Sequence, residues 1–392
     1  MIDPAQLIGP SSALGAPAPY WFLVFFKVLG FTLHSAFMHV WFAGSLVALL
    51  LGRSGGVYSQ LLSARLLRRM PIVIAYGVNF GIVPLLFTQV AYYKVFYPAT
   101  ILMAWPWFSI FVLLTVAYYG TYLYAGGLHE GSRLTPLRHA AGWTAAILFL
   151  AIGLLFTNAF SLMVNVAAWP HLWLTSSVAG APMGTALNLG DPTLWPRWLM
   201  MFGIALTTTA AYIAIDAGLF AAAAPADYRQ WGRGFAFKLY SLGLVWFGCA
   251  GLTYLASWPL ELRDAAFNGW RATLMLLTAL APGLPWLLLM QQSRSGERRV
   301  LAWAVGIAQF GVLGLNAVSR QVVQNLQLNP FVDVTSEPVN LQWSPLLSFL
   351  ALFVAGLAVI AWMLSKAVAA GHRGLAPAPV TEPRGKVRSL AS

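Results

Sequence analysis

The stretch YWFLVFFKVLGFTLHSAFMHVWFAGSLVALLL, residues 20–51, contains one lysine, two histidines and no acidic residue in 32 positions. About 20 consecutive apolar residues suffice for a helix to cross a bilayer, so this stretch predicts a transmembrane helix. Ionisable side chains inside a membrane usually face the interior of a helix bundle and mark a redox, proton or ligand site. His34 and His39 therefore indicate that this helix does more than anchor the chain, and imidazole in a helical bundle makes haem the first candidate ligand.

The rest of the chain repeats this pattern. Only 9% of its 392 residues are charged, whereas a soluble domain carries about 25%. The sequence predicts an all-α polytopic membrane protein, a bundle of about nine transmembrane helices without strand-like alternation. The expected spans are 20–52, 72–92, 98–125, 139–168, 195–224, 234–258, 270–290, 300–319 and 345–367.

The basic residues alternate between loops. Most Lys and Arg residues follow the first, third, fifth and seventh spans or lie in the C-terminal tail. By the positive-inside rule this pattern places the N-terminus outside and the C-terminus in the cytoplasm. The net charge of +12 is accounted for by these loops, so we do not infer nucleic-acid binding from it.

The expected organisation is one membrane domain. Residues 1–19 form a short outer lead-in without Lys or Arg, which argues against a signal peptide. Residues 20–367 form the transmembrane domain, and residues 368–392 form a basic cytoplasmic tail that we expect to be disordered. Two longer outer connections, 169–194 and 320–344, are candidates to cap an outer-facing pocket.

His34 and His39 are the candidate metal ligands. Five residues on an α-helix correspond to about 140° of rotation, so the two imidazoles do not share a face and do not chelate one iron from one side. His34 could bind haem iron from a neighbouring cavity. The alternative for each histidine is a hydrogen bond to an adjacent helix. No C-x-x-C-H segment exists for covalent haem attachment, and the single cysteine, Cys249, is interpreted as a packing residue.

Other polar residues fall inside predicted spans. Asp216 requires a partner or handles protons, and Lys27 is a candidate to form a proton or charge pair with it; the alternative is that Asp216 reaches water. Asn158 either bridges helices or contacts a cofactor. Arg271, and Arg320 with Gln321, lie near the outer side, where a guanidinium could hold a haem propionate or a quinone carbonyl, or could simply extend to the interface.

Short motifs in these helices resemble subunit I of the cytochrome bd quinol oxidases. The likeness covers residues 20–365 and includes a nine-helix topology. The residues that carry it are His34 with Gly44, the segment Gly77-Val-Asn-Phe-Gly81-Ile, Asn158-Ala-Phe-Ser-Leu-Met, Arg197-Trp-Leu-Met200, Trp270-Arg271 and Arg320-Gln321.

The departures from that family are also informative. Met200 stands where the family has an axial histidine, and Thr273 where it has the methionine partner, although Met275 is near. The segment 111–115 has no carboxylate where the family has glutamate, and Phe310 or a neighbour stands at a second glutamate position. The quinol-binding loop is reduced to about residues 259–269. Only the helix-1 histidine is retained, so oxygen reduction by this chain alone is not expected.

The resemblance implies a subunit of a respiratory electron-transfer complex in the bacterial inner membrane. It would pass electrons between the quinone pool and a partner redox subunit, such as a c-type cytochrome, beside another membrane subunit. The cofactors implied are zero or one haem b, with iron on His34, and quinone. Two alternatives stay open: a haem-free quinone-interacting anchor, and a non-redox scaffold. Whether the chain is part of an enzyme is left open.

Overall fold

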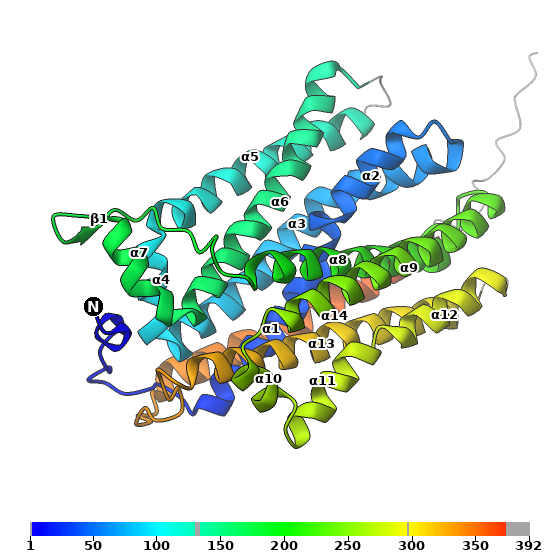
Figure 1. Ribbon diagram of the computed structural model, residues 1–392. Helices are drawn as coiled ribbons and strands as arrows, with labels where there is room; N and C mark the ends of the chain where they lie inside the picture. Colours follow the sequence, from blue (N-terminus) through cyan, green and yellow to red (C-terminus); the bar gives the residue numbers. More distant parts are fainter. Residues whose placement is uncertain (1, 130–133, 296–297, 374–392) are drawn as a thin grey trace, which may run out of the picture.

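The computed structural model describes residues 2–129, 134–295 and 298–373, and these form an elongated helical bundle (Figure 1). In this part of the chain, nine helices are long and apolar enough to cross a membrane, as predicted. The predicted tail at 368–392 lies largely outside the described residues. The helices are α1 Tyr20–Phe42, α2 Gly44–Arg53, α3 Val57–Ala91, α4 Tyr93–Leu102, α5 Ala104–His129, α6 Pro136–Val164, α7 Trp169–Thr175, α8 Leu194–Ile215, α9 Ala226–Ala256, α10 Leu260–Ala266, α11 Trp270–Leu280, α12 Gly283–Arg294, α13 Arg299–Leu328 and α14 Trp343–Arg373.

Several of the predicted spans are shorter than the helices they correspond to, and the two largest differences are in α3 and α13. Helix α3 begins at Val57 rather than residue 72, and α13 continues to Leu328 rather than residue 319. Both helices extend through polar residues that a hydropathy pattern assigns to loops. Two spans consist of consecutive helices, because α1 is followed by α2 after Ala43, and α11 by α12 after Pro282.

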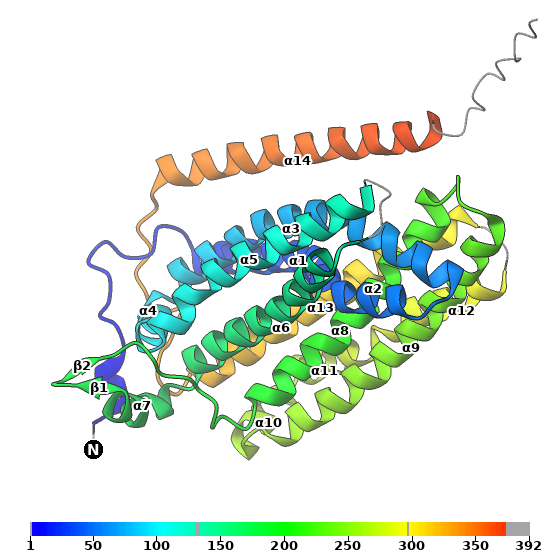
Figure 2. The ribbon, with the colours of Figure 1, turned by 90° about the horizontal axis from the view of Figure 1, so that it is seen from above.

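The long connections and the N-terminal lead-in lie at one end of the bundle, which we call the N-terminal end (Figures 1 and 2). A 3₁₀ turn at Pro4–Leu7, helices α4, α7 and α10, and the loop 329–342 are at this end. Here too is a two-stranded antiparallel hairpin, β1 Ser177–Val178 and β2 Ala181–Pro182, which pairs Ser177 with Pro182. Strand structure was not predicted from the sequence, because each strand has only two residues.

The core is formed by α1, α3, α8 and α9 with their neighbours. Helices α8 and α9 pack closely because glycines face backbone: a Cβ at Gly203 would lie 2.6 Å from the Phe247 nitrogen, and one at Gly243 would lie 2.9 Å from the Thr207 nitrogen. No hydrophobic effect drives helices together in lipid. Small residues at helix contacts stabilise the packing instead, because they let the two backbones approach closely.

The last helix is set apart from this core. Figure 2 shows α14 along one side of the bundle. Its first turns contact the bundle through Phe349, whose ring packs against Phe22, Phe26 and Phe87. The remaining large apolar side chains of the described part of α14 are mostly exposed, which suits a helix surrounded by lipid.

Candidate functional site

His34 is bound to α3 through one ring nitrogen. Its Nδ1 lies 2.7 Å from the carbonyl oxygen of Gly77. A carbonyl can only accept, so Nδ1 carries the hydrogen and Nε2 presents a lone pair. The ring lies against Gly81, where an added Cβ would be 2.8 Å from the imidazole. A histidine oriented through one nitrogen, with the other nitrogen unprotonated, is the arrangement that metal-binding histidines use.

His39 belongs to a buried hydrogen-bond network. Its Nδ1 lies 3.1 Å from the Thr208 hydroxyl, which donates to the carbonyl of Ile204 and also receives Gln309 Nε2 at 3.1 Å. The single Thr208 hydrogen is thus used, and His39 Nδ1 is the donor. The network continues from Gln309 Oε1 to the Tyr240 hydroxyl, 2.9 Å away. These contacts cross-link α1, α8, α9 and α13. Because they also leave Nε2 of His39 unprotonated, the choice of His34 as the proposed ligand rests on the family resemblance of its segment and not on its hydrogen bond alone.

Asn158 is buried, and both the oxygen and the nitrogen of its amide make a contact. Its Oδ1 accepts from the Asn188 backbone at 2.8 Å, and its Nδ2 lies 3.4 Å from the sulfur of Met103. Asn188 in turn donates to Asp191 at 3.0 Å, and Asp191 also accepts from Ser161. Asn158 was expected either to bridge helices or to contact a cofactor, and these contacts favour the bridging role. Through Asn188 it fastens the connection that precedes α8 onto α6.

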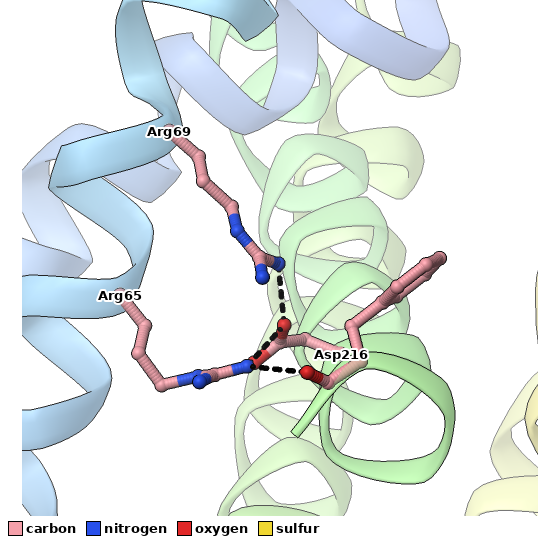
Figure 3. Close-up of polar contacts among 4 residues, drawn as sticks. Arg65, Arg69 and Asp216 are labelled. Atoms are coloured by element: carbon pink, nitrogen blue, oxygen red, sulfur yellow. Dashed lines mark hydrogen bonds and ion pairs between the residues drawn. The ribbon is translucent and has the colours of Figure 1, made fainter. Parts of the chain in front are cut away.

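The predicted pair of Lys27 and Asp216 is wrong. Asp216 begins a π-helical turn, Asp216–Phe220, at the end of α8, and accepts hydrogen bonds from Arg65 at 2.8 Å and Arg69 at 2.5 Å (Figure 3). Lys27 lies seven residues into α1, near the N-terminal end. At 1.5 Å per residue the two positions are about 20 Å apart along the bundle.

Lys27 is instead surrounded by amides. Its ammonium donates to Gln321 Oε1 at 2.7 Å and to Gln324 Oε1 at 3.0 Å, and lies 4.3 Å from the centre of the Tyr92 ring. Gln321 also donates to the Tyr92 hydroxyl and, at 2.9 Å, to Asn325. The structure thus brings together two of the predicted site residues, Lys27 and Gln321. Gln324 and Tyr92 were not predicted, because neutral polar side chains in apolar helices give no charge signal.

Arg320 lies between two aromatic rings. Its guanidinium carbon is 4.6 Å from the centre of the Phe31 ring and 5.0 Å from that of Phe160. The Phe31 ring is in turn 6.5 Å from the ring of His34. Arg271 begins α11 at the same end of the bundle, and its Nε is buried without a hydrogen-bond partner. Arg320 therefore adjoins His34, whereas no contact among the described residues joins Arg271 to this group.

The donor set limits which metals could bind. Among the described residues, no group of three or more His, Cys, Asp and Glu side chains could hold a metal ion. A single imidazole with a free Nε2 suits an ion whose other ligands belong to a cofactor, as in haem.

The fold itself is that of a bd oxidase. The chain is similar to a solved chain described as "The structure of bd oxidase from Geobacillus thermodenitrificans", with a TM-score of 0.58 and 14% sequence identity, over 95% of this chain and 99% of that one. No family model matches the sequence, and no curated protein matches it. At this identity the likeness establishes the fold alone, and the nine candidate spans among the described residues confirm the predicted scaffold of a multi-pass membrane protein.

Proposed function

We propose that this chain is a membrane subunit of a respiratory electron-transfer complex and carries one b-type haem on His34. The observation that supports it is the orientation of His34, whose Nδ1 is bound to Gly77 and whose Nε2 is left with its lone pair. The bd-oxidase fold supports the same assignment by analogy. Electrons would pass between the quinone pool and a partner redox subunit, in a bacterial inner membrane with the N-terminal end outside.

A bound haem would supply one-electron storage, and the protein would supply position and environment. His34 would hold the iron, and the Gly77 carbonyl would fix the imidazole. Arg320 adjoins His34 through Phe31 and would supply a positive charge for a haem propionate. Oxygen reduction is not part of this proposal, since Met200 and Thr273 stand where the resemblance leads us to look for ligands of a further haem.

The test is a reduced-minus-oxidised visible spectrum of the purified chain, with the haem quantified as its pyridine haemochrome. We expect about one haem b per chain in the wild type and its loss in His34→Ala, because the side chain that would hold the iron is removed. The control is His139→Ala, an exposed histidine on α6. Full haem content and quinol-linked activity in His34→Ala would contradict the assignment.

A haem-free quinone anchor is the second candidate. It is favoured by the position of Lys27, Tyr92 and the two glutamines, which place hydrogen-bond donors inside the bundle where a quinone carbonyl could accept. Binding of a quinone analogue by a chain without a Soret band would establish it. Normal electron flux in a complex whose copy of this chain binds neither haem nor quinone would instead indicate a scaffold.

A further inference from the structure

Helix α3 carries one amide side chain on its exposed side, in the middle of its membrane-spanning part. Asn79 is exposed, and it lies ten positions after Arg69 and twelve positions before Ala91, the last residue of the helix. At 1.5 Å per residue these separations are about 15 Å and 18 Å, and the hydrocarbon of a bilayer is about 30 Å thick. Asn79 is therefore close to the middle of the bilayer.

The hydrogen-bonding groups of Asn79 are only partly used. Its Nδ2 donates to the carbonyl oxygen of Ala75, 2.8 Å away in the same helix. This bond fixes the orientation of the amide, because a carbonyl can only accept. Among the residues that the structure describes, none donates a hydrogen bond to Oδ1 of Asn79, and one N–H of Nδ2 stays free. Lipid offers these groups no partner, so leaving them unpaired in a bilayer is costly.

The side chains around Asn79 form a continuous apolar face. Ile72, Ile82 and Leu86 are each at least half exposed. Ile72, Asn79, Ile82 and Leu86 follow one another at intervals of seven, three and four residues, which is the spacing of the a and d positions in a coiled coil. No charged residue occurs in the segment 70–93, so two such faces can meet without charge repulsion.

The other sides of α3 already have neighbours. The Gly77 carbonyl accepts from His34 of α1, and the Tyr76 hydroxyl lies 3.8 Å from the sulfur of Met363 in α14. Helix α5 packs against a further side. The face that contains Asn79 is thus a side of α3 that the described part of the bundle leaves uncovered.

We propose that the Asn79 face of α3 is the contact between two copies of this chain in the membrane. Copies inserted the same way can be related by a two-fold axis along the membrane normal, which brings the same side chain of each α3 together at one depth. An amide suits this contact because it has both a donor and an acceptor, so the free N–H of each Asn79 can donate to Oδ1 of the other. Asparagine at an a position also fixes register and pairing in parallel coiled coils. The proposal concerns assembly and does not depend on haem binding.

Energy transfer between labelled chains measures this association. Full-length chains with a donor or an acceptor fluorophore at the C-terminus are reconstituted together in phosphatidylcholine vesicles over a range of protein-to-lipid ratios. Asn79→Leu removes the amide and keeps the face apolar, whereas Asn79→Gln keeps an amide. The matched control is Thr253→Leu, which replaces an exposed polar side chain on α9 whose hydroxyl donates within its own helix to the Cys249 carbonyl at 2.9 Å.

We expect wild-type chains to associate and Asn79→Leu to weaken the association by about tenfold, the effect of losing a pair of amide hydrogen bonds between membrane helices. Asn79→Gln should restore most of the affinity, and Thr253→Leu should match the wild type. The proposal is overturned if wild-type chains show only the energy transfer of random proximity, or if Asn79→Leu associates as tightly as the wild type.

Cross-linking separates a second copy from a different partner. In a Cys249→Ala chain, which has no other cysteine, oxidation of Asn79→Cys by copper phenanthroline in membranes should give a disulfide-linked dimer of this chain. Leu252→Cys, at an exposed position on α9, should give no dimer. A product that contains another protein, without a dimer of this chain, would reject the second copy and assign the Asn79 face to a different subunit.

Discussion

At the scale of single residues, Asp216 is a carboxylate that binds two arginines of α3. It accepts from Arg65 through two nitrogens and from Arg69 through one (Figure 3), and its side chain is buried. Removing one partner of a buried ion pair leaves an uncompensated charge. Of the roles considered from the sequence, Asp216 thus has the partners that it requires, and we expect its role to be structural.

Substituting Asp216 tests this role. Asp216→Asn should lower the free energy of unfolding by about 2–4 kcal/mol, because two partly buried guanidinium groups lose their counter-charge. The measurement is thermal unfolding in an uncharged detergent. Asp227→Asn is the control, an exposed carboxylate in the first turn of α9, and its effect should be well below that. Equal effects of the two substitutions would contradict the role of Asp216.

Tyr240 and Gln309 are buried partners whose energies should not add. The Tyr240 hydroxyl donates to Gln309 Oε1, and Gln309 Nε2 donates to Thr207 and Thr208. Tyr240→Phe leaves Gln309 Oε1 without its donor, whereas in Gln309→Leu the Tyr240 hydroxyl keeps the Pro282 carbonyl, 3.1 Å away, as an acceptor. The double variant removes both partners of the bond. A double-mutant cycle followed by thermal unfolding should give a coupling energy of about 1 kcal/mol. Additive effects would show that this hydrogen bond contributes little.

At the scale of elements, the contact between α8 and α9 depends on the missing side chain of Gly203. A Cβ there would meet the backbone of Phe247, which cannot rotate away as a side chain can. Gly203→Ala should therefore destabilise the protein by about 1–3 kcal/mol through overpacking. Gly248→Ala, one residue after Phe247 and facing open space, should instead be neutral or stabilise by about 0.5–1 kcal/mol. Gly203→Ala should lower the melting temperature and Gly248→Ala should leave it unchanged or raise it, and an equal decrease in both would argue against this close contact.

At the scale of the whole molecule, the N-terminal lead-in is fastened across the bundle end by backbone bonds to the loop 329–342, and one ion pair joins that loop to α4. Ala16 donates to the Pro338 carbonyl at 2.8 Å, Asn340 donates to the Ala16 carbonyl at 2.9 Å, and Glu337 pairs with Lys94. The hydrogen bond from Lys94 holds the pKa of the Glu337 carboxyl below its ordinary value. A lowered carboxyl pKa means that the pair stabilises this contact above the ordinary pKa and that the stabilisation is lost as the pH falls through the lowered value.

Hydrogen exchange at Ala16 and Asn340 measures this dependence. Protection of both amides should be full at neutral pH and should fall once the pH drops below the ordinary range of a glutamate, after correction for the intrinsic exchange rate. Glu337→Gln should show reduced protection that no longer changes with pH in this range. Unchanged protection in Glu337→Gln would mean that the backbone bonds alone hold the lead-in.

The sequence predicted the scaffold better than the polar contacts inside it. Runs of apolar residues are enough to place nine spans, because a bilayer requires them. The pairing of Asp216 was missed because hydropathy began the second span at residue 72, which assigned Arg65 and Arg69 to a loop, whereas α3 begins at Val57. Thr208, Gln309 and Gln324 were missed because uncharged polar residues barely change local hydropathy. His34 was identified because imidazole is rare in such a helix, but its bond to Gly77 depends on how two helices pack.

The ion group at Asp216 also constrains the order in which mutations can accumulate in a lineage. Asp216 pairs with both Arg65 and Arg69. A chain that first loses one of these arginines therefore keeps one carboxylate paired with one arginine. The loss of the aspartate first leaves two cations without a counter-charge. Among descendants of this gene, chains that lack an arginine at 65 or 69 but keep the aspartate should therefore be common intermediates, and chains with both arginines but no acid should be rare.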